Sequence, residues 1–324
     1  MRTSTKSRTS NLEFRIGIIV DAGPSLGYGH AVRCLRLANA LTDAASIVFY
    51  PLSESCREFL VSSATNPKFE IRDSQGQIDS VPPLVITDLR EAHGITADIH
   101  RQGSRHLSIH DLGLAQCRSN VAIDGSITRL FPYPEDKKRA LFAGPQYMIT
   151  REPVARLKSK DTVFITFGGG STANFAQKIS EDVLELGLRP VTTRGFVGSA
   201  PMSDEEFVRT MATCRFAIAG AGTTLYDLLA SRVPTIAVAF DRLQLRTADA
   251  FHEQGAVLSA GLLERLSPSA LKGHCREMLE NKPLIQRLTE VGQKLVDGKG
   301  LSRVIEIVRR ELWLTSREKT FTAC

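Results

Sequence analysis

The fold is decided at residues 16–41, which read IGIIV-DAGPSLGYGH-AVRCLRLANAL. The run Ile16–Val20 is short, apolar and rich in β-branched residues, and it predicts a buried strand. The glycine turn Gly27-Tyr28-Gly29-His30 then leads into a helical pattern over 31–41. A strand that passes through a glycine turn into a helix is typical of an α/β fold with a parallel sheet.

The same turn is a candidate site for chemistry. Gly27 and Gly29 have no Cβ, so the backbone can turn tightly and bring its N–H groups close to an anion such as phosphate. The positive end of the helix dipole disfavours imidazolium, which favours a neutral His30 that can accept a proton. A tight turn whose histidine only packs remains the alternative interpretation of this motif alone.

Apolar runs alternate with longer helical patterns along the rest of the chain. The predicted strands are Ile16–Val20, Ser46–Tyr50, Leu84–Thr87, His106–His110, Val121–Asp124, Val163–Phe167, Pro190–Thr193, Phe216–Ala219 and Thr235–Ala239. Continuous apolar strands separated by helices indicate parallel sheets that are covered on both faces.

A polar, proline-bearing segment at 144–161 lies near the midpoint of the 324 residues. We therefore predict two Rossmann-like, doubly wound domains, at 12–150 and at 151–324, the second including the C-terminal helices. Ligand sites in such domains lie at the carboxyl ends of the strands, so the two sites should face a common cleft. Residues 1–11 are basic, rich in serine and threonine, and free of acids, which predicts a disordered tail or, alternatively, a transit peptide.

Two further glycine turns follow predicted strands in the second half. Gly168 and Gly169 come after the strand at 163–167, and Gly222-Thr223-Thr224 comes after the strand at 216–219. A strand, a glycine turn, hydroxyl groups and a helix present free N–H groups to a diphosphate. The G-x-x-x-x-G-K-[ST] pattern of nucleoside triphosphatases is absent, and a purely structural turn is the alternative.

Two polar side chains beyond these turns are candidates for ligand binding. Asp227 lies one helical turn after Thr223, where a carboxylate can accept hydrogen bonds from two ribose hydroxyls, or can simply favour the start of a helix. Gln244 begins another helix after a strand and can reach a ligand or act as a surface cap.

Composition excludes several other classes of protein. The net charge of +6 suits an anionic ligand, but basic and acidic residues are interleaved, so no nucleic-acid partner is predicted. No apolar run approaches the roughly 18 residues that a membrane span needs. Six scattered cysteines without C-x-x-C pairs indicate the reducing cytoplasm. His106 and His110 have the spacing of a zinc pair on a helix, but the residues between them favour a strand, so no metal or other cofactor is predicted.

Several ordered motifs together resemble those of a known family, the UDP-2,4-diacetamido-2,4,6-trideoxy-β-L-altropyranose hydrolases of pseudaminic acid biosynthesis, with the related spore-coat polysaccharide proteins. The motifs are Asp21-Ala22-Gly23, Gly27-Tyr28-Gly29-His30, Arg33-Cys34-Leu35, Gly144-Pro145-Gln146-Tyr147, Phe167-Gly168-Gly169, Gly222-Thr223-Thr224 with Asp227, Pro234, Gln244 and Val296-Asp297-Gly298. The resemblance spans nearly the whole chain and implies the fold of GT-B glycosyltransferases, with UDP held mainly by the second domain.

The resemblance also implies a reaction and roles for residues. His30 would be the general base that activates water, the Gly222 turn would hold the diphosphate, and Asp227 stands where the family usually has a ribose-binding glutamate. Asp88 and Asp111 end strands on the sugar side and are candidates to orient the base or the substrate, although the family usually has a tyrosine near the acid where this chain has Leu89-Arg90.

We therefore predict a cytoplasmic, metal-independent hydrolase that releases UDP from an amino-deoxy UDP-sugar for nonulosonic acid or surface polysaccharide synthesis. A glycosyltransferase that uses a UDP-sugar donor, and an inactive sugar-nucleotide-binding protein, remain alternatives because the fold alone does not separate them. The sequence leaves the sugar, the bond that is cleaved and the oligomeric state open.

Overall fold

The computed structural model describes residues 14–24, 26–72, 80–89, 95–110, 118–129, 139–157, 161–167, 173–193 and 202–321. Its strands are β1 (Phe14–Val20), β2 (Ala45–Pro51), β3 (Phe69–Ile71), β4 (Leu84–Asp88), β5 (Arg105–His110), β6 (Val121–Asp124), β7 (Ala140–Ala143), β8 (Thr162–Thr166), β9 (Arg189–Thr192), β10 (Phe216–Gly220), β11 (Thr235–Ala239) and β12 (Leu258–Leu262). The helices are α1 (Gly29–Ala40), α2 (Glu54–Ser63), α3 (Ile95–Arg101), α4 (Ala173–Leu184), α5 (Asp204–Thr213), α6 (Thr223–Ala230), α7 (Arg242–Gln254), α8 (Pro268–Glu280), α9 (Lys282–Leu295) and α10 (Gly300–Phe321), with 3-10 turns at Pro145–Tyr147 and Leu263–Arg265.

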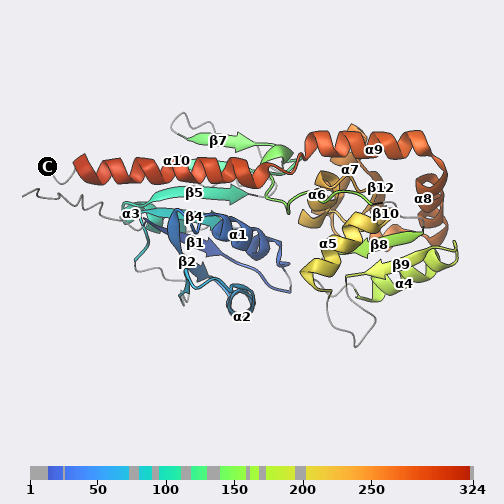
Figure 1. The fold of residues 1–324 in the computed structure, drawn as a ribbon, viewed down its shortest axis with the longest axis horizontal. Helices are drawn as coiled ribbons and strands as arrows, with labels where there is room; N and C mark the ends of the chain where they lie inside the picture. Colours follow the sequence, from blue (N-terminus) through green and yellow to red (C-terminus); the bar gives the residue numbers. More distant parts are fainter. Residues whose placement is uncertain are drawn as a thin grey trace, which may run out of the picture.

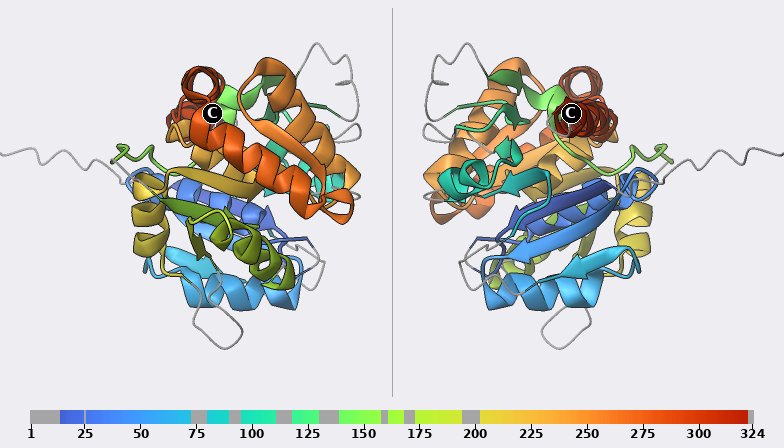
Figure 2. Two further views of the ribbon diagram at one scale, coloured as in Figure 1. Left: turned by 90° about the vertical axis from the view of Figure 1, so that its right-hand side faces the viewer. Right: turned by 90° about the vertical axis from the view of Figure 1, so that its left-hand side faces the viewer.

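The strands form two parallel sheets, which confirms the predicted α/β class with two Rossmann-like domains. The first sheet has the order β3-β2-β1-β4-β5-β6-β7 and the second the order β12-β11-β10-β8-β9. The two sheets lie end to end along the longest axis of the molecule (Figures 1 and 2). Chain order reverses between β1 and β4 in the first sheet and between β8 and β10 in the second, and ligands of doubly wound sheets bind at such reversals.

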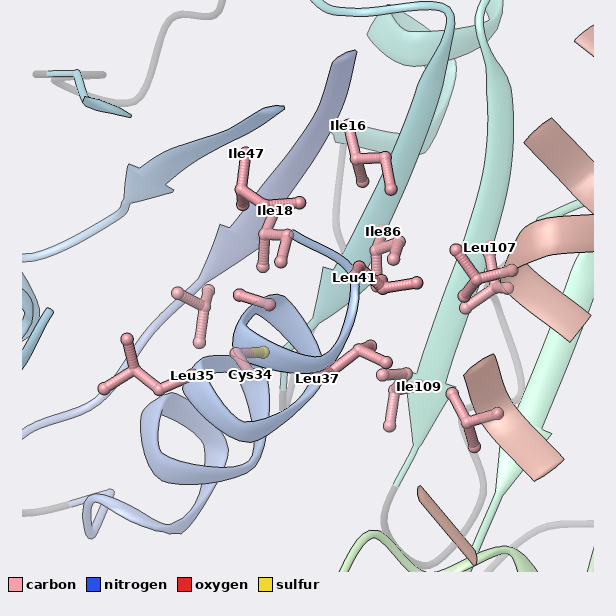
Figure 3. Close-up of a cluster of buried hydrophobic side chains, with 14 of the residues drawn as sticks. Ile16, Ile18, Cys34, Leu35, Leu37, Leu41, Ile47, Ile86, Leu107 and Ile109 are labelled. Atoms are coloured by element: carbon pink, nitrogen blue, oxygen red, sulfur yellow. The ribbon is translucent and has the colours of Figure 1, made fainter. Parts of the chain in front are cut away.

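Helix α1 covers the first sheet because its apolar residues recur on one side. Cys34, Leu37 and Leu41 belong to one buried cluster with side chains of the neighbouring strands, among them Ile18 and Ile86 (Figure 3). The opposite face of this sheet is covered in part by Ile99 of α3. This packing fixes α1 over β1 and β4 and sets the position of its first turn.

Helix α10 packs on the first domain, which differs from the predicted domain division. We predicted that the C-terminal helices belong with residues 151–324, but α10 returns to the first domain and lies along its sheet (Figure 1). The reason is the apolar face of the helix, because Val304, Val308 and Leu312 join the core cluster of the first sheet. Arg309 adds an ion pair at 2.6 Å with Asp43, which follows α1. The first domain is therefore built from both ends of the chain.

No helix among the described residues is both long enough and apolar enough to cross a membrane.

Candidate active site at the interface of the two domains

The first glycine turn is closed by its own backbone. The Gly27 N–H donates to the Gly23 carbonyl oxygen at 2.7 Å, and the Gly23 N–H donates in return at 3.2 Å. Gly27 has a φ of +80°, a conformation that side-chain-bearing residues rarely adopt. Helix α1 begins at Gly29 without a capping side chain. The backbone N–H groups of its first turn therefore have no capping side chain, which is compatible with the predicted anion-binding role.

His30 belongs to a compact group of polar side chains. Asp88 ends β4, next to β1, and its Oδ1 lies 2.7 Å from His30 Nδ1. Arg33 follows His30 by one helical turn and binds the same carboxylate with two nitrogens, Nη2 to Oδ1 at 2.5 Å and Nε to Oδ2. Asp88 is fully buried, and Arg33 is 1% exposed. The structure thus brings His30 and Asp88, two of the predicted catalytic residues, into contact, and Arg33 holds Asp88 in place.

The charges within this group set the protonation of its members. Burial acts to raise the pKa of Asp88, but the Arg33 guanidinium and His30 outweigh it and hold that pKa well below its usual range. Asp88 is therefore a carboxylate at neutral pH and accepts the proton of His30 Nδ1. This bond places the basic lone pair of the imidazole on Nε2, the arrangement that a general base requires.

Cys34 also contacts this group, but its thiol is not a candidate nucleophile. Its Sγ donates to Asp88 Oδ2 at 3.5 Å. Burial, followed by the negative charge of Asp88, raises the pKa of the thiol well above its ordinary value. Because the thiolate is the reactive form of cysteine, Cys34 is a structural side chain here.

The second-domain turn meets the first turn across the domain interface. Helix α6 begins at Thr223 after Gly222, which supplies no capping side chain. A Cβ added to Gly29 would lie only 2.9 Å from Thr223 Oγ1. A side chain at position 29 would therefore require the Thr223 side chain or one of the two turns to shift. Gly222, Thr223 and Thr224 are partly exposed. The predicted diphosphate turn lies beside the start of α1, because Thr223 is close to Gly29.

Asp227 has a role between the domains that the sequence did not predict. Its carboxylate lies 3.4 Å from both terminal nitrogens of Arg36 on α1, and it accepts the backbone N–H of Arg151 at 2.7 Å. Asp227 is 5% exposed. Desolvation by burial lowers the pKa of Arg36, against the opposing effect of Asp227. Asp227 thus connects α6 to α1 and to the segment that links the domains.

The remaining predicted residues divide into three groups. Gln244 accepts the backbone N–H of Phe240 at 3.3 Å and so caps the turn before α7. His106 and His110 lie on β5, as predicted, and their ring nitrogens bond to the hydroxyls of Thr87 at 2.8 Å and Ser108 at 2.6 Å. Asp111, Gly168 and Gly169 lie outside the described residues.

Sequence reasoning did not assign Arg33 or Arg36 to the site. Both lie on α1, at positions 3 and 6 after His30, and both are charged residues within an otherwise apolar helical pattern. A long cation on the buried side of a helix needs a carboxylate partner, because an unpaired charge is rarely buried. The two arginines in the helical pattern therefore predict buried carboxylate partners. The partner of Arg33 is Asp88, and the partner of Arg36 is Asp227.

Solved structures that superpose on this chain identify its fold. Solved structures of the GT-B type superpose on nearly the whole chain, among them the spinosyn forosaminyltransferase SpnP, with a TM-score of 0.65, 11% identity, and coverage of 91% of this chain and 99% of that one. UGT2 of Phytolacca americana, solved with UDP-2-fluoro-glucose and pterostilbene, superposes with a TM-score of 0.65, 11% identity, and coverage of 92% and 99%. The chain therefore has the GT-B-like fold that the sequence predicted.

Sequence comparison finds a relative that matches nearly the whole chain. The spore coat polysaccharide biosynthesis protein SpsG of Bacillus subtilis is 23% identical over 337 residues, which cover 91% of this chain and 97% of that protein. The predicted resemblance to the spore-coat polysaccharide proteins is thereby confirmed. No protein-family model matches the chain.

Proposed function

We propose that this protein hydrolyses an amino-deoxy UDP-sugar and releases UDP, with His30 as the general base, in the synthesis of a nonulosonic acid or another surface polysaccharide precursor. The observation that carries the proposal is the His30–Asp88–Arg33 group at the first glycine turn, whose Gly29 lies close to Thr223 of the second domain. The similarity to SpsG, named for spore coat polysaccharide biosynthesis, supports the pathway class.

In this proposal each member of the group has a distinct task. Asp88 holds the Nδ1 proton of His30, so that Nε2 takes a proton from the attacking water. Arg33 keeps Asp88 ionised and fixed through two hydrogen bonds, and it does not itself meet the substrate. A positioned general base contributes typically about 10²–10⁴-fold to the rate. Asp111 stays a proposed partner on the sugar side.

The leaving group would be stabilised by the second domain. The first turn of α6, with Gly222, Thr223 and Thr224, would bind the diphosphate through backbone N–H groups and hydroxyls. Gly168 and Gly169, which follow β8 in the sequence, are proposed to contribute to this binding. UDP leaves as a stabilised anion, so N–H groups that face its growing charge can support the reaction without a metal ion.

A glycosyltransferase is the second candidate, and the structural neighbours favour it. The glycosyltransferases of kitacinnamycin and calicheamicin (CalG4) superpose on more than nine-tenths of this chain. In that case His30 would deprotonate an acceptor hydroxyl in place of water, and the roles of Asp88 and the α6 turn would not change.

The deciding experiment is incubation with a panel of UDP-sugars in ¹⁸O-labelled water, without an acceptor. Hydrolysis predicts release of UDP, with ¹⁸O in the free sugar for C–O cleavage or in a phosphate product for P–O cleavage. A transferase would release UDP efficiently only when an acceptor is added. Binding of UDP-sugar without turnover under either condition would leave a sugar-nucleotide-binding protein and would refute the proposal.

A further inference from the structure

Two contacts join helix α1 of the first domain to helix α6 of the second. At the starts of the helices, a Cβ added to Gly29 would lie 3.7 Å from Thr223 Cβ. Further along both helices, Arg36 Nη1 and Nη2 lie 3.4 Å from Asp227 Oδ1 and Oδ2, respectively. The two helices therefore lie side by side across the domain interface, with their first turns at the same end.

The spacing of these residues places both contacts on one face of each helix. On α1, Arg36 stands about two helical turns after Gly29, and on α6, Asp227 stands about one turn after Thr223. Residues separated by whole turns share a helix face. The contact along α6 is thus closer to the helix start than the contact along α1, and the long arginine side chain can cover that difference.

Asp227 is also held by its own side of the interface. It accepts the backbone N–H of Arg151 at 2.7 Å. The Arg151 side chain donates to Asp204 at the start of α5, and its guanidinium carbon lies 4.7 Å from the centre of the Phe207 ring. The second domain and the linker therefore fix the carboxylate, and Arg36 is the charged group that the first domain brings to it.

The burial of this pair indicates what it contributes. The side chain of Arg36 is 19% exposed and that of Asp227 is 6% exposed. A pair so far from water adds little net stability, because the cost of desolvation offsets the attraction. Its best-attested use is to specify one arrangement, since any other arrangement leaves a buried charge without its partner. The pair therefore favours the arrangement in which the two first turns meet.

We propose that Arg36 is a positioning residue, which holds the two domains closed so that His30 faces a ligand bound at the first turn of α6. His30 lies in the first turn of α1, whereas Thr223 and the proposed diphosphate turn belong to the other domain, so neither domain carries both. Arg36 would act through the position of α1. Its effect on turnover rests on the proposed function, whereas its effect on domain closure does not.

Closure can be measured with the variant Gly29→Cys/Thr223→Cys. The separation of 3.7 Å between the two Cβ positions suits a disulfide. The intact protein, without nucleotide, is treated with oxidised glutathione, and peptide mapping follows the bond between positions 29 and 223.

The rate of this cross-link should depend on the charge at position 36. Addition of Arg36→Met should slow cross-linking by roughly three- to tenfold, because a larger share of the molecules is open. Arg36→Lys keeps the charge and should recover most of the rate. Arg209→Met breaks an exposed ion pair on α5 and is the matched control, which should cross-link at the unchanged rate.

Turnover is measured in Arg36→Met without the introduced cysteines. The kcat for the UDP-sugar should fall by roughly three- to tenfold, whereas UDP affinity should stay within about twofold of the wild type, because closure affects the base more than the nucleotide. Arg36→Lys should again recover most of the loss.

The outcomes separate this role from the proposed function. Unchanged cross-linking in Arg36→Met, or an equal loss in Arg209→Met, would overturn the role in closure. Slower cross-linking with an unchanged kcat would overturn the role in positioning His30. If the wild type hydrolyses no UDP-sugar, the proposed function fails, and the cross-linking rates still decide whether Arg36 holds the domains closed.

Discussion

Replacement of Asp88 by asparagine should strongly destabilise the first domain. The substitution keeps the shape of the side chain but removes the charge that two nitrogens of Arg33 contact. The Arg33 side chain is only 2% exposed, so its guanidinium would stay buried without a counter-charge. Removal of one partner from a buried ion pair costs about 3–5 kcal/mol. This is a large part of the roughly 5–15 kcal/mol that stabilises a typical domain.

The variant Arg33→Met/Asp88→Asn provides the matched control. It removes the whole pair, and replacement of a buried pair by residues of similar volume is often nearly neutral. The double variant should therefore be more stable than Asp88→Asn alone, with a coupling energy of about 2 kcal/mol or more in a double-mutant cycle. Urea unfolding can be followed by the fluorescence of Trp313, the only tryptophan, which lies on α10. A loss below about 1 kcal/mol in Asp88→Asn would refute the buried-pair argument.

Three further predictions follow from particular residues. Burial, with smaller contributions from nearby cationic groups, lowers the pKa of His106 to about 3. Below about pH 6.5 the unfolded chain therefore binds a proton at this residue that the folded chain does not bind, so the free energy of unfolding should fall by about 1.4 kcal/mol for each pH unit from about pH 6.5 towards 3. His106→Gln should flatten this slope in unfolding measurements. Gly29→Ala places a methyl group 2.9 Å from Thr223 Oγ1 and should lower stability by about 1–3 kcal/mol, with recovery in Gly29→Ala/Thr223→Ala; an unchanged unfolding temperature in the single variant would show that the turns do not meet. UDP at a hundredfold excess over its Kd should stabilise the wild type by about 2.7 kcal/mol, and Asp227→Ala should reduce that gain in thermal unfolding; an equal gain would leave Asp227 with its interdomain contacts alone.

The sequence predicts the sheets well because their central strands are apolar and β-branched. Every predicted strand is present, within one or two residues of its predicted ends. The strands that were not predicted are β3, β7 and β12. The strand β3 has three residues, β7 reads ALFA and β12 reads LSAGL, so none has a β-branched run to distinguish it from a loop. Their strand conformation comes from pairing with a neighbouring strand, which is a tertiary effect.

Contacts between distant residues explain what the sequence could not show about the site. A local pattern is enough to find His30, which follows β1 through the first glycine turn, and Asp88, which is the last residue of β4. Their contact depends on the pairing of β1 with β4. Arg36 and Asp227 are 191 positions apart, and no local pattern relates them. The return of α10 to the first domain is also a long-range contact, which a boundary placed by composition does not detect.

The turnover of His30→Asn shows whether His30 is the general base. The experiment compares UDP release from the UDP-sugar that the wild type hydrolyses best, with UDP affinity and unfolding temperature measured on the same samples. His274→Asn, a replacement of a surface histidine on α8, is the control. We predict that His30→Asn folds and binds UDP as the wild type does, while kcat falls by about 10²–10⁴-fold and His274→Asn keeps full activity. A folded His30→Asn protein that hydrolyses the UDP-sugar at close to the wild-type rate would show that His30 is not the general base.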